Sequence, residues 1–472
     1  MAMNAAANAV EGLMSKPDPV DTTSFANPKE DPAAFADPSG EKMQALVWEG
    51  KNSVAIRESL KPKVVDADDI VIKVTGSTVC GSDMHLFGGA IIEMRSGDIL
   101  GHEAMGIVES VGPNVKKLKV GDRVVAGFNI GCGQCYMCEK KLSSQCFKTN
   151  DSALMNTMYG ARTCGMLGYS HFTGGFAGCQ AEYVRLPYGE ANVVVVPEGV
   201  SDEDAIYLSD TYTTSFHQVE DSGVKQGDIV GIWGVGSIGI MAGKWSALKG
   251  VSHIIAIDNV PWRLENFKAK IQSQHPEVKV DCVDFSQVKD VPAKIQELTA
   301  SGKDGRPATR PPGVDVALEC AAGEYAKGWV HKLELMTGLE TDTSEILNEM
   351  IASTIGYGTI GITGVYAGLC NHFNIGSIMQ RGIRFIGNGQ APCHKYLQRI
   401  MDEYIVTGKV KASELILTHR VPLDNVPEVY TQMRARSGKD EIIKTFVTTR
   451  FSGPPAPGAP KEERVGGVKP RV

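Results

Sequence analysis

The chain has 472 residues, of which 42% are hydrophobic, and 48 basic against 55 acidic side chains give it a net charge of −7. This composition is ordinary for a globular protein of more than one domain, and the lack of a basic stripe argues against nucleic acid as a partner. No apolar run approaches the roughly 20 residues that a membrane helix needs, and the first forty residues lack an apolar signal segment, so we expect a cytoplasmic protein without a membrane partner.

Both ends of the chain are predicted to be disordered, because residues 1–42 and residues 451–472 are rich in small, polar and proline residues and show no apolar periodicity. Between these ends, residues 43–208 contain short β-rich segments separated by glycine. Examples of these segments are Asp69–Val74, Gly106–Val111, Asp122–Val125 and Asn192–Val196. We therefore expect a β-rich first domain over residues 43–208.

A thiol and an imidazole in this domain could form part of a catalytic metal site. Cys80 lies shortly after the strand segment at residues 71–75, and His102 lies at the end of the loop that follows. A catalytic zinc site needs three protein ligands and one open position, so the third ligand must come from elsewhere in the chain. The alternatives are that Cys80 is a buried apolar thiol and that His102 is a loop histidine with ordinary hydrogen-bond partners.

Four cysteines follow on a short loop that contains glycine. They are Cys132, Cys135, Cys138 and Cys146. Because the cytosol keeps thiols reduced, clustered cysteines there are more often metal ligands than disulfide partners. Four thiolates fill the tetrahedral shell of Zn²⁺ and leave no open position, so we expect a structural zinc site. An iron–sulfur cluster and ordinary buried cysteines are the alternatives.

The sequence pattern changes at about residue 209. From there to residue 387, strand-like apolar runs alternate with helical stretches, which is the rhythm of a doubly wound parallel sheet. Strands are expected at Asp228–Trp233, His253–Asp258, Val314–Cys320, Thr359–Val365 and Arg384–Gly387. The fold class is therefore α/β, with a Rossmann-type domain over residues 209–387 in addition to the β-rich domain.

A glycine motif of the G-x-G-x-x-G type, formed by Gly234, Gly236 and Gly239, follows the first of these strands and precedes a helical stretch. Such glycines let the backbone approach a pyrophosphate at a helix N-terminus. Asp258 ends the next strand, where a carboxylate binds the ribose hydroxyls and disfavours NADP, so we predict NAD. Arg263 could touch the ribose or be a solvated helix charge. The alternative for the whole motif is a plain turn, with Asp258 capping the next helix.

The order of these motifs, from Cys80 and His102 through the four-cysteine loop to the glycine motif, resembles the zinc-dependent medium-chain alcohol dehydrogenases. The resemblance covers most of residues 43–450 and implies a GroES-like catalytic domain over residues 43–208 and 388–450. It also implies two zinc ions per chain, an alcohol or aldehyde as substrate, and a homo-oligomer that is either a dimer or a tetramer.

Three segments resemble one branch of that family, the glutathione-independent formaldehyde dehydrogenases and formaldehyde dismutases. They are Gly174-Gly175, Gln180–Val184 and Leu208–Asp210. In this branch the third ligand of the catalytic zinc is an aspartate at the position of Asp210, so the resemblance implies Cys80, His102 and Asp210 as ligands. The alternative is that Asp210 caps the following helix and that Glu103 is the third ligand.

The resemblance assigns roles to further residues. Ser82 would hydrogen-bond the substrate oxygen and His85 would relay its proton to solvent, while Glu103 would lie beside the zinc as a neighbouring or exchanging ligand. Thr214 matches a threonine on the nicotinamide side, and Lys444 matches a cation that binds the pyrophosphate, although the spacing around it differs from the family pattern. A turn serine, a surface histidine, a helix threonine and a solvated lysine are the alternatives.

Two segments, residues 148–166 and 325–355, are longer than a minimal member of the family needs. In formaldehyde-converting relatives an inserted loop shields the cofactor, so NAD could be tightly held or exchangeable. We predict a zinc-dependent oxidoreductase that transfers a hydride from an alcohol or a hydrated aldehyde to NAD. The alternatives are a polyol or threonine-type dehydrogenase with Glu103 on the zinc, and a catalytically silent, dehydrogenase-like binding protein.

Overall fold

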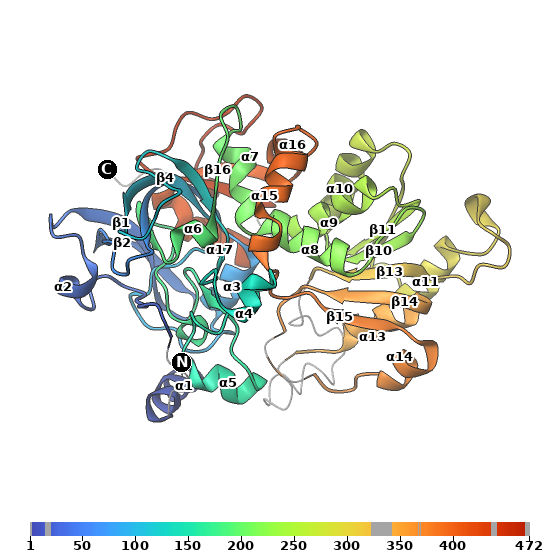
Figure 1. The fold of residues 1–472 in the computed structure, drawn as a ribbon. Helices are drawn as coiled ribbons and strands as arrows, with labels where there is room; N and C mark the ends of the chain where they lie inside the picture. Colours follow the sequence, from blue (N-terminus) through green and yellow to red (C-terminus); the bar gives the residue numbers. More distant parts are fainter. Residues whose placement is uncertain are drawn as a thin grey trace. The chain divides into compact units, whose positions relative to one another are not determined.

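A computed structural model of the chain describes residues 2–14, 20–321, 342–366, 368, 370–435 and 441–467 (Figure 1). The chain divides into two compact units, one comprising Met1–Thr213 with Pro392–Val472 and the other comprising Thr214–Ala391. Part of the long segment 325–355 and the last residues of the predicted tail lie outside the described residues. Within the described ranges, none of the helices has the length and apolar character needed to cross a membrane.

The first unit is built on a sheet of seven strands. Four neighbouring strands of its antiparallel part are β3 (Ile70–Ser77), β4 (Ala104–Val111), β5 (Arg123–Ala126) and β9 (Val193–Val195). β3 also pairs with β8 (Tyr183–Leu186). β3 is buried along almost its whole length and is rich in β-branched residues, which pack well in a strand that is covered on both faces.

The C-terminal part of the chain returns to this sheet. β17 (Lys444–Thr448) is antiparallel to β3, with Val447 opposite Ser77, and parallel to β16 (Leu417–Pro422). Two smaller antiparallel pairs complete the first unit. They are β1 (Lys42–Gly50) with β2 (Ser53–Leu60), and β6 (Asn129–Ile130) with β7 (Gly165–Met166). β17 is therefore bonded to the strand that leads into Cys80.

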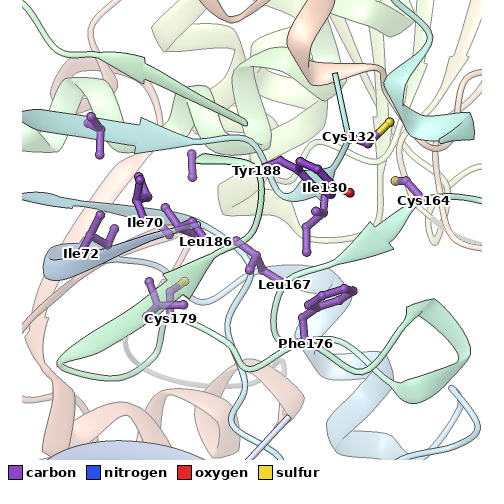
Figure 2. Packing of buried hydrophobic residues seen from close by; sticks show 14 of the residues in the cluster. Ile70, Ile72, Ile130, Cys132, Cys164, Leu167, Phe176, Cys179, Leu186 and Tyr188 are labelled. Carbon is purple, nitrogen blue, oxygen red and sulfur yellow. The ribbon is translucent and has the colours of Figure 1, made fainter. Parts of the chain in front are cut away.

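A hydrophobic core joins this sheet to the four-cysteine loop. Ile70 and Ile72 of β3 belong to the same buried cluster as Leu186 of β8 and as Cys132 and Cys164 (Figure 2). Burial of a side chain the size of isoleucine or leucine contributes about 1.5–3 kcal/mol. The loop is therefore held by packing as well as by any metal that it binds.

The helices of the first unit connect these strands. They are α1 (Ala2–Leu13), α2 (Pro32–Phe35), α3 (Gly81–Gly88), α4 (Tyr136–Glu139), α5 (Ala153–Tyr159), α6 (Gly189–Asn192), α7 (Asp202–Ala205), α15 (Leu397–Ile400), α16 (Ala412–Leu415) and α17 (Val426–Ala435). A further helix, α8 (Thr211–Asp221), begins in the first unit and continues in the second.

The second unit contains a six-stranded parallel sheet in the order β12-β11-β10-β13-β14-β15. Its strands are β10 (Ile229–Trp233), β11 (His253–Asp258), β12 (Lys279–Asp284), β13 (Val314–Glu319), β14 (Thr354–Ile362) and β15 (Arg384–Gly387). Numbered from β10, this is the order 3-2-1-4-5-6 of dinucleotide-binding folds. The predicted α/β class with a doubly wound parallel sheet is confirmed.

Helices cover both faces of this parallel sheet. Figure 1 shows α9 (Ser237–Leu248) and α10 (Pro261–Gln274) on one face, and α13 (Glu345–Ser353) and α14 (Ile375–Arg381) on the other. α11 (Val291–Leu298) follows β12. β12 was not predicted from the sequence, because this edge strand is only partly buried and its charged residues break the apolar run that marks the other strands.

The expectation of disorder over residues 1–42 is wrong for the described residues. The side-chain amide of Asn4 in α1 donates to the carbonyl of Met94 at 2.7 Å, and its oxygen accepts from the N–H of Met94 at 2.9 Å. Glu11 accepts from the N–H groups of Ala153 and Leu154, at 3.0 and 2.7 Å, where α5 begins. The docked face of α1 is therefore polar, whereas Val10 and Leu13 are exposed, so its apolar residues do not mark the side that packs.

The described part of the predicted tail is also ordered. Beyond β17, the N–H of Glu463 donates to the carbonyl of Arg420 at 2.9 Å, and Val465 is buried with its N–H bonded to the side-chain oxygen of Asn425 at 2.9 Å. Single contacts of this kind hold a segment that is rich in proline and glycine. Its composition therefore predicted the irregular backbone but not its attachment.

Candidate metal and cofactor sites

The four thiols of the loop between β6 and β7 converge as the sequence predicts. Their Sγ atoms all lie within 4.8 Å of one another, and all four residues are buried. The Sγ atoms of Cys132 and Cys138 are 4.0 Å apart, and those of Cys135 and Cys146 are 3.8 Å apart. A zinc tetrahedron with bonds of about 2.3 Å has sulfur–sulfur edges of about 3.8 Å, so the donor set fits Zn²⁺.

Backbone groups of the loop support thiolates rather than disulfides. The N–H of Cys132 points to Cys146 Sγ at 3.4 Å, and the N–H of Cys135 points to Cys132 Sγ at 3.3 Å. The eleven cysteines all lie in the described part of the chain, and none of them forms a disulfide. A cavity of about 450 Å³ borders the loop, and Cys132, Cys138, Lys141 and His394 are among its lining residues.

A second cluster joins Cys80, His102, Glu103 and Asp210, whose ligand atoms also lie within 4.8 Å of one another. Cys80 stands at the N-terminus of α3, and His102 and Glu103 directly precede β4. Asp210 lies between the 3-10 helix Ile206–Ser209 and α8. A thiolate, an imidazole and a carboxylate are suitable donors for Zn²⁺, so this cluster also fits the metal.

Within this cluster the Asp210 carboxylate is the acid nearest to the other two candidate ligands. Its Oδ2 lies 3.6 Å from Cys80 Sγ and 3.4 Å from His102 Nε2, whereas Glu103 Oε1 lies 4.0 Å from His102 Nε2. The structure thus brings together the residues that the sequence singled out, and it does so from three separate segments.

The orientation of His102 depends on Asp83, which the sequence analysis did not single out. Asp83 Oδ1 lies 3.2 Å from His102 Nδ1, on the side of the ring opposite to Asp210. Burial acts to lower the pKa of His102, but Asp83 and Asp210 together raise it well above its usual value. A carboxylate behind a histidine orients the ring and makes its free nitrogen a better metal ligand.

Asp83 is itself held by a buried hydrogen-bond chain. Its Oδ2 accepts from the N–H of Cys80 at 2.8 Å and from the side-chain amide of Gln180 at 3.2 Å. The oxygen of that amide accepts from the hydroxyl of Tyr430 at 2.9 Å. The position of Asp83, three residues after Cys80 at the start of a helix, was the one sequence signal that could have identified it.

Lys444 occupies a different place from the one that the sequence predicted, and its assignment to the pyrophosphate is corrected. Its side chain is buried in β17, and its Nζ donates to Oε1 of Glu103. Burial acts to lower the pKa of Lys444, but Cys80 and Glu103 raise it, so the amine stays charged. Lys444 therefore neutralises Glu103, because the pairing of two buried charges avoids the cost of an unpaired one.

The two predicted proton-handling residues lie on α3. Ser82 Oγ is 3.3 Å from His102 Nε2, so its hydroxyl reaches the metal-ligand cluster. His85 lies three residues further along the same helix and is half-buried. Residues three apart on a helix share a face, which places the two side chains on one side of α3.

The glycine motif forms the turn between β10 and α9. A Cβ on Gly239 would lie 2.0 Å from the carbonyl oxygen of Gly234, and one on Gly234, whose φ is +90°, would lie 2.9 Å from Ala321. A Cβ on Gly236, the N-cap of α9, would meet nothing within 4 Å. Two glycines are thus required by packing, whereas Gly236 borders open space of the kind that a dinucleotide would fill.

Three further residues belong to the predicted cofactor site. Asp258 Oδ2 accepts from the N–H of Val235 at 2.9 Å, inside the glycine turn, and its Oδ1 accepts from the N–H groups of Asn259 and Val260 at 2.8 and 3.0 Å, so Oδ2 is the oxygen with capacity left for a ribose hydroxyl. The guanidinium of Arg263 stacks on the Trp262 ring, 5.5 Å from its centroid, and its buried Nε has no hydrogen-bond partner among the described residues. Thr214 is half-buried in α8. These features are compatible with a bound nucleotide.

A parallel sheet with a dinucleotide-type turn and a buried Cys–His–carboxylate cluster are together the features of a metal-dependent nicotinamide dehydrogenase. Residues 66–198 match the family described as the alcohol dehydrogenase GroES-like domain. A zinc-type alcohol dehydrogenase-like protein of Schizosaccharomyces pombe is 37% identical over 411 residues, which cover 87% of this chain and 92% of that protein.

Two further proteins agree with that match. A glutathione-independent formaldehyde dehydrogenase of Pseudomonas aeruginosa is 28% identical over 425 residues, which cover 85% of this chain and 97% of that protein. The structure of the alcohol dehydrogenase TADH from Thermus sp. ATN1 superposes with a TM-score of 0.69 at 26% identity, over 86% of this chain and all of that one. This chain belongs to the zinc-dependent medium-chain alcohol dehydrogenases and is an oxidoreductase of that family.

Proposed function

We propose that this chain oxidises a primary or secondary alcohol, or a hydrated aldehyde, by hydride transfer to NAD. The observation that carries the proposal is the convergence of Cys80, His102 and Asp210 on one buried point, with Ser82 beside them. A zinc ion bound there would supply a Lewis acid that polarises the substrate oxygen. The second unit would hold the nicotinamide nucleotide at its glycine turn.

The third ligand is proposed to be Asp210 rather than Glu103. One oxygen of Glu103 is bonded to Lys444, and the other has no hydrogen-bond partner among the described residues, so Glu103 lies beside the cluster as half of an ion pair. With Cys80 as thiolate, Asp210 as carboxylate and His102 neutral, the charges of the ligands balance those of Zn²⁺. Glu103 as a ligand, as in polyol dehydrogenases, is the second candidate, because its Oε1 also lies within the cluster.

The protein groups around this site are proposed to handle the proton that the substrate hydroxyl loses. Ser82 would accept the hydrogen bond of that hydroxyl, since its Oγ already reaches the metal face of His102. His85, on the same face of α3, would pass the proton to solvent, because an imidazole can accept a proton at one ring nitrogen and donate from the other. Asp83 would hold the ring of His102 in place throughout.

The remaining cofactors follow from the other two sites. We propose a second, structural zinc on Cys132, Cys135, Cys138 and Cys146, since the four thiols leave no open position. We propose NAD rather than NADP, because the carboxylate of Asp258 beside the glycine turn would repel a 2′-phosphate. Thr214 and Arg263 are proposed to contact the nucleotide. The cytoplasmic location and the dimeric or tetrameric state stay predictions of the sequence.

The experiment that tests this function is a measurement of NADH formation with a panel of alcohols and with hydrated formaldehyde, at fixed NAD or NADP. Wild type should reduce NAD with at least one substrate, and Ser82→Ala should lower kcat while leaving zinc content unchanged. Glu198→Ala removes an exposed carboxylate and serves as the control. Full zinc content without any reduction of nucleotide would instead identify a silent binding protein.

A further inference from the structure

A short element of the C-terminal segment contacts the chain segments next to both metal-ligand clusters of the first unit. This element is the 3-10 helix Cys393–Lys395. The ring of His394 bonds to the four-cysteine loop through Ser143 Oγ at its Nδ1 and to Asn192 Oδ1 at its Nε2. The neighbouring side chain, Cys393, is buried on the side of Asp210.

The direction of the His394 hydrogen bonds follows from their partners. The side-chain amide nitrogen of Asn192 donates to three main-chain carbonyls, including that of Gly131, so the other atom of the amide is the oxygen and can only accept. His394 must therefore donate from Nε2. Burial, with Lys141 nearby, lowers the pKa of His394 to about 4. The neutral ring then accepts at Nδ1 from the hydroxyl of Ser143.

These bonds hold the four-cysteine loop near both of its ends. Asn192 Oδ1 also accepts from the N–H of Gly131 at 2.8 Å, directly before Cys132. The carbonyl of Ser143 accepts from the N–H of Cys146 at 3.0 Å. A Cβ on Gly131 would lie 3.3 Å from His394 Cε1, so the ring packs against the backbone of the loop. His394 thus links the start of the loop, next to Cys132, to the segment that leads into Cys146.

The other half of the element contacts the segment that carries Asp210. Cys393 Sγ lies 3.3 Å from Thr213 Oγ1 and 3.7 Å from the carbonyl oxygen of Ser209. Thr213 Oγ1 in turn donates to the carbonyl of Asp210 at 2.9 Å. Asp210 has φ −142° and ψ −69°, outside the helical region, at the junction of two helices. Contacts on both sides of such a junction determine where its carboxylate points.

We propose that His394 is a positioning residue that, through Cys393, couples the order of the four-cysteine loop to the position of Asp210. Metal binding by the loop then raises the zinc affinity of the Cys80–His102–Asp210 cluster without any direct contact between the two metals. This inference rests on the two zinc sites of the proposed function, and it adds an interaction between them that neither site requires alone.

A double-mutant cycle on the zinc affinity of the catalytic cluster tests the coupling. The four proteins are wild type, Cys135→Ser, His394→Phe and the double variant, each titrated with zinc against a chromophoric chelator, and Cys80→Ser supplies the binding curve of the loop alone. Each single substitution should weaken zinc binding by the catalytic cluster about tenfold. This is the lower end of the loss in metal affinity seen when a residue that supports a metal ligand is replaced. The double variant should be no weaker than either single one, and Lys395→Ala should match wild type.

Two variants separate hydrogen bonding from shape. Gln can donate to Asn192 and accept from Ser143, so His394→Gln should restore most of the affinity that His394→Phe loses. If His394→Phe fails to fold, Ser143→Ala takes its place in the cycle, because it removes one bond only. If the losses of zinc affinity multiply in the double variant, or if His394→Gln binds zinc as weakly as His394→Phe, the coupling is overturned but the proposed function is not. A wild-type chain with a single zinc overturns the coupling and the proposed function together.

Discussion

Asp83 Oδ1 lies 3.2 Å from Nδ1 of His102, and Nε2 of the same ring lies 3.4 Å from Asp210. The ring therefore stands between a carboxylate that orients it and one that shares its metal. We expect Asp83→Asn to weaken zinc binding at this cluster about 10–100-fold, because the orienting charge is lost while the shape is kept. Competition with a chelator of known affinity measures the change, and an unchanged affinity would show that the ring is held by packing alone.

The buried pair of Lys444 and Glu103 predicts an effect on folding stability. Lys444→Met should destabilise the chain by about 3–5 kcal/mol, because it leaves the charge of Glu103 buried without a partner. Urea unfolding of the metal-free protein measures the loss, and the double variant Lys444→Met with Glu103→Gln should regain much of it. If Lys444→Met instead kept its stability and lost only NAD affinity, the original pyrophosphate assignment would be restored.

Replacement of a glycine by alanine in the glycine turn is expected to affect stability at one position and NAD binding at another. Gly239→Ala should destabilise the second unit, because its Cβ would lie 2.0 Å from the carbonyl oxygen of Gly234. Gly236→Ala should leave thermal stability near that of wild type, since its Cβ meets nothing within 4 Å, yet it should weaken NAD binding at least about tenfold by filling the space of the pyrophosphate. Thermal melts and NADH fluorescence titrations distinguish the two, and undiminished NAD affinity in Gly236→Ala would place the nucleotide elsewhere.

Glu93 predicts a dependence of stability on pH. Burial and the nearby Glu11 raise the pKa of Glu93 to about 7, with Asp151 acting in the same sense and with His171 and Arg95 opposing them. A carboxyl with a raised folded-state pKa binds more protons in the folded than in the unfolded state. Its contribution to folding stability is therefore fully present below the unfolded pKa of about 4.3 and is lost as the pH rises through 7. Glu93→Gln should therefore be more stable than wild type at pH 8, by about 2 kcal/mol, and nearly equal to it at pH 4.

Urea midpoints at the two pH values measure the effect of Glu93→Gln. Glu190→Gln, at a half-buried carboxylate whose pKa is lowered by hydrogen bonds from the N–H groups of Lys117 and Lys116, is a suitable control because its pH trend has the opposite sign. An equal stability difference at both pH values would show that Glu93 is not the titrating group.

The sequence predicted the elements whose pattern depends on local spacing. The four cysteines, the glycine turn and the parallel strands β10, β11, β13 and β15 all follow short rules of periodicity or ligand spacing. β12 was missed because an edge strand carries charges that break its apolar run. The helix α1 was missed because it docks through Asn4 and Glu11 rather than through an apolar face.

The parts of the site that sequence reasoning missed depend on contacts between distant segments. Gln180 supports Asp83 across nearly a hundred positions, and Lys444 reaches Glu103 across more than three hundred. No local rule indicates which buried lysine faces which buried glutamate, so Lys444 was assigned by its surrounding motif alone. The tertiary pairing of β17 with β3 is what brings it to the metal-ligand cluster.

The zinc content of the purified protein tests the central claim most directly. We would measure zinc per chain by elemental analysis in wild type, Asp210→Ala, Glu103→Gln and the control Glu198→Ala. Two zinc ions are expected in wild type, Glu103→Gln and the control, and one in Asp210→Ala, because that variant loses a ligand of the catalytic cluster while the four thiols keep theirs. Two zinc ions in Asp210→Ala with one in Glu103→Gln would contradict the ligand assignment, and one or none in wild type would contradict the catalytic site itself.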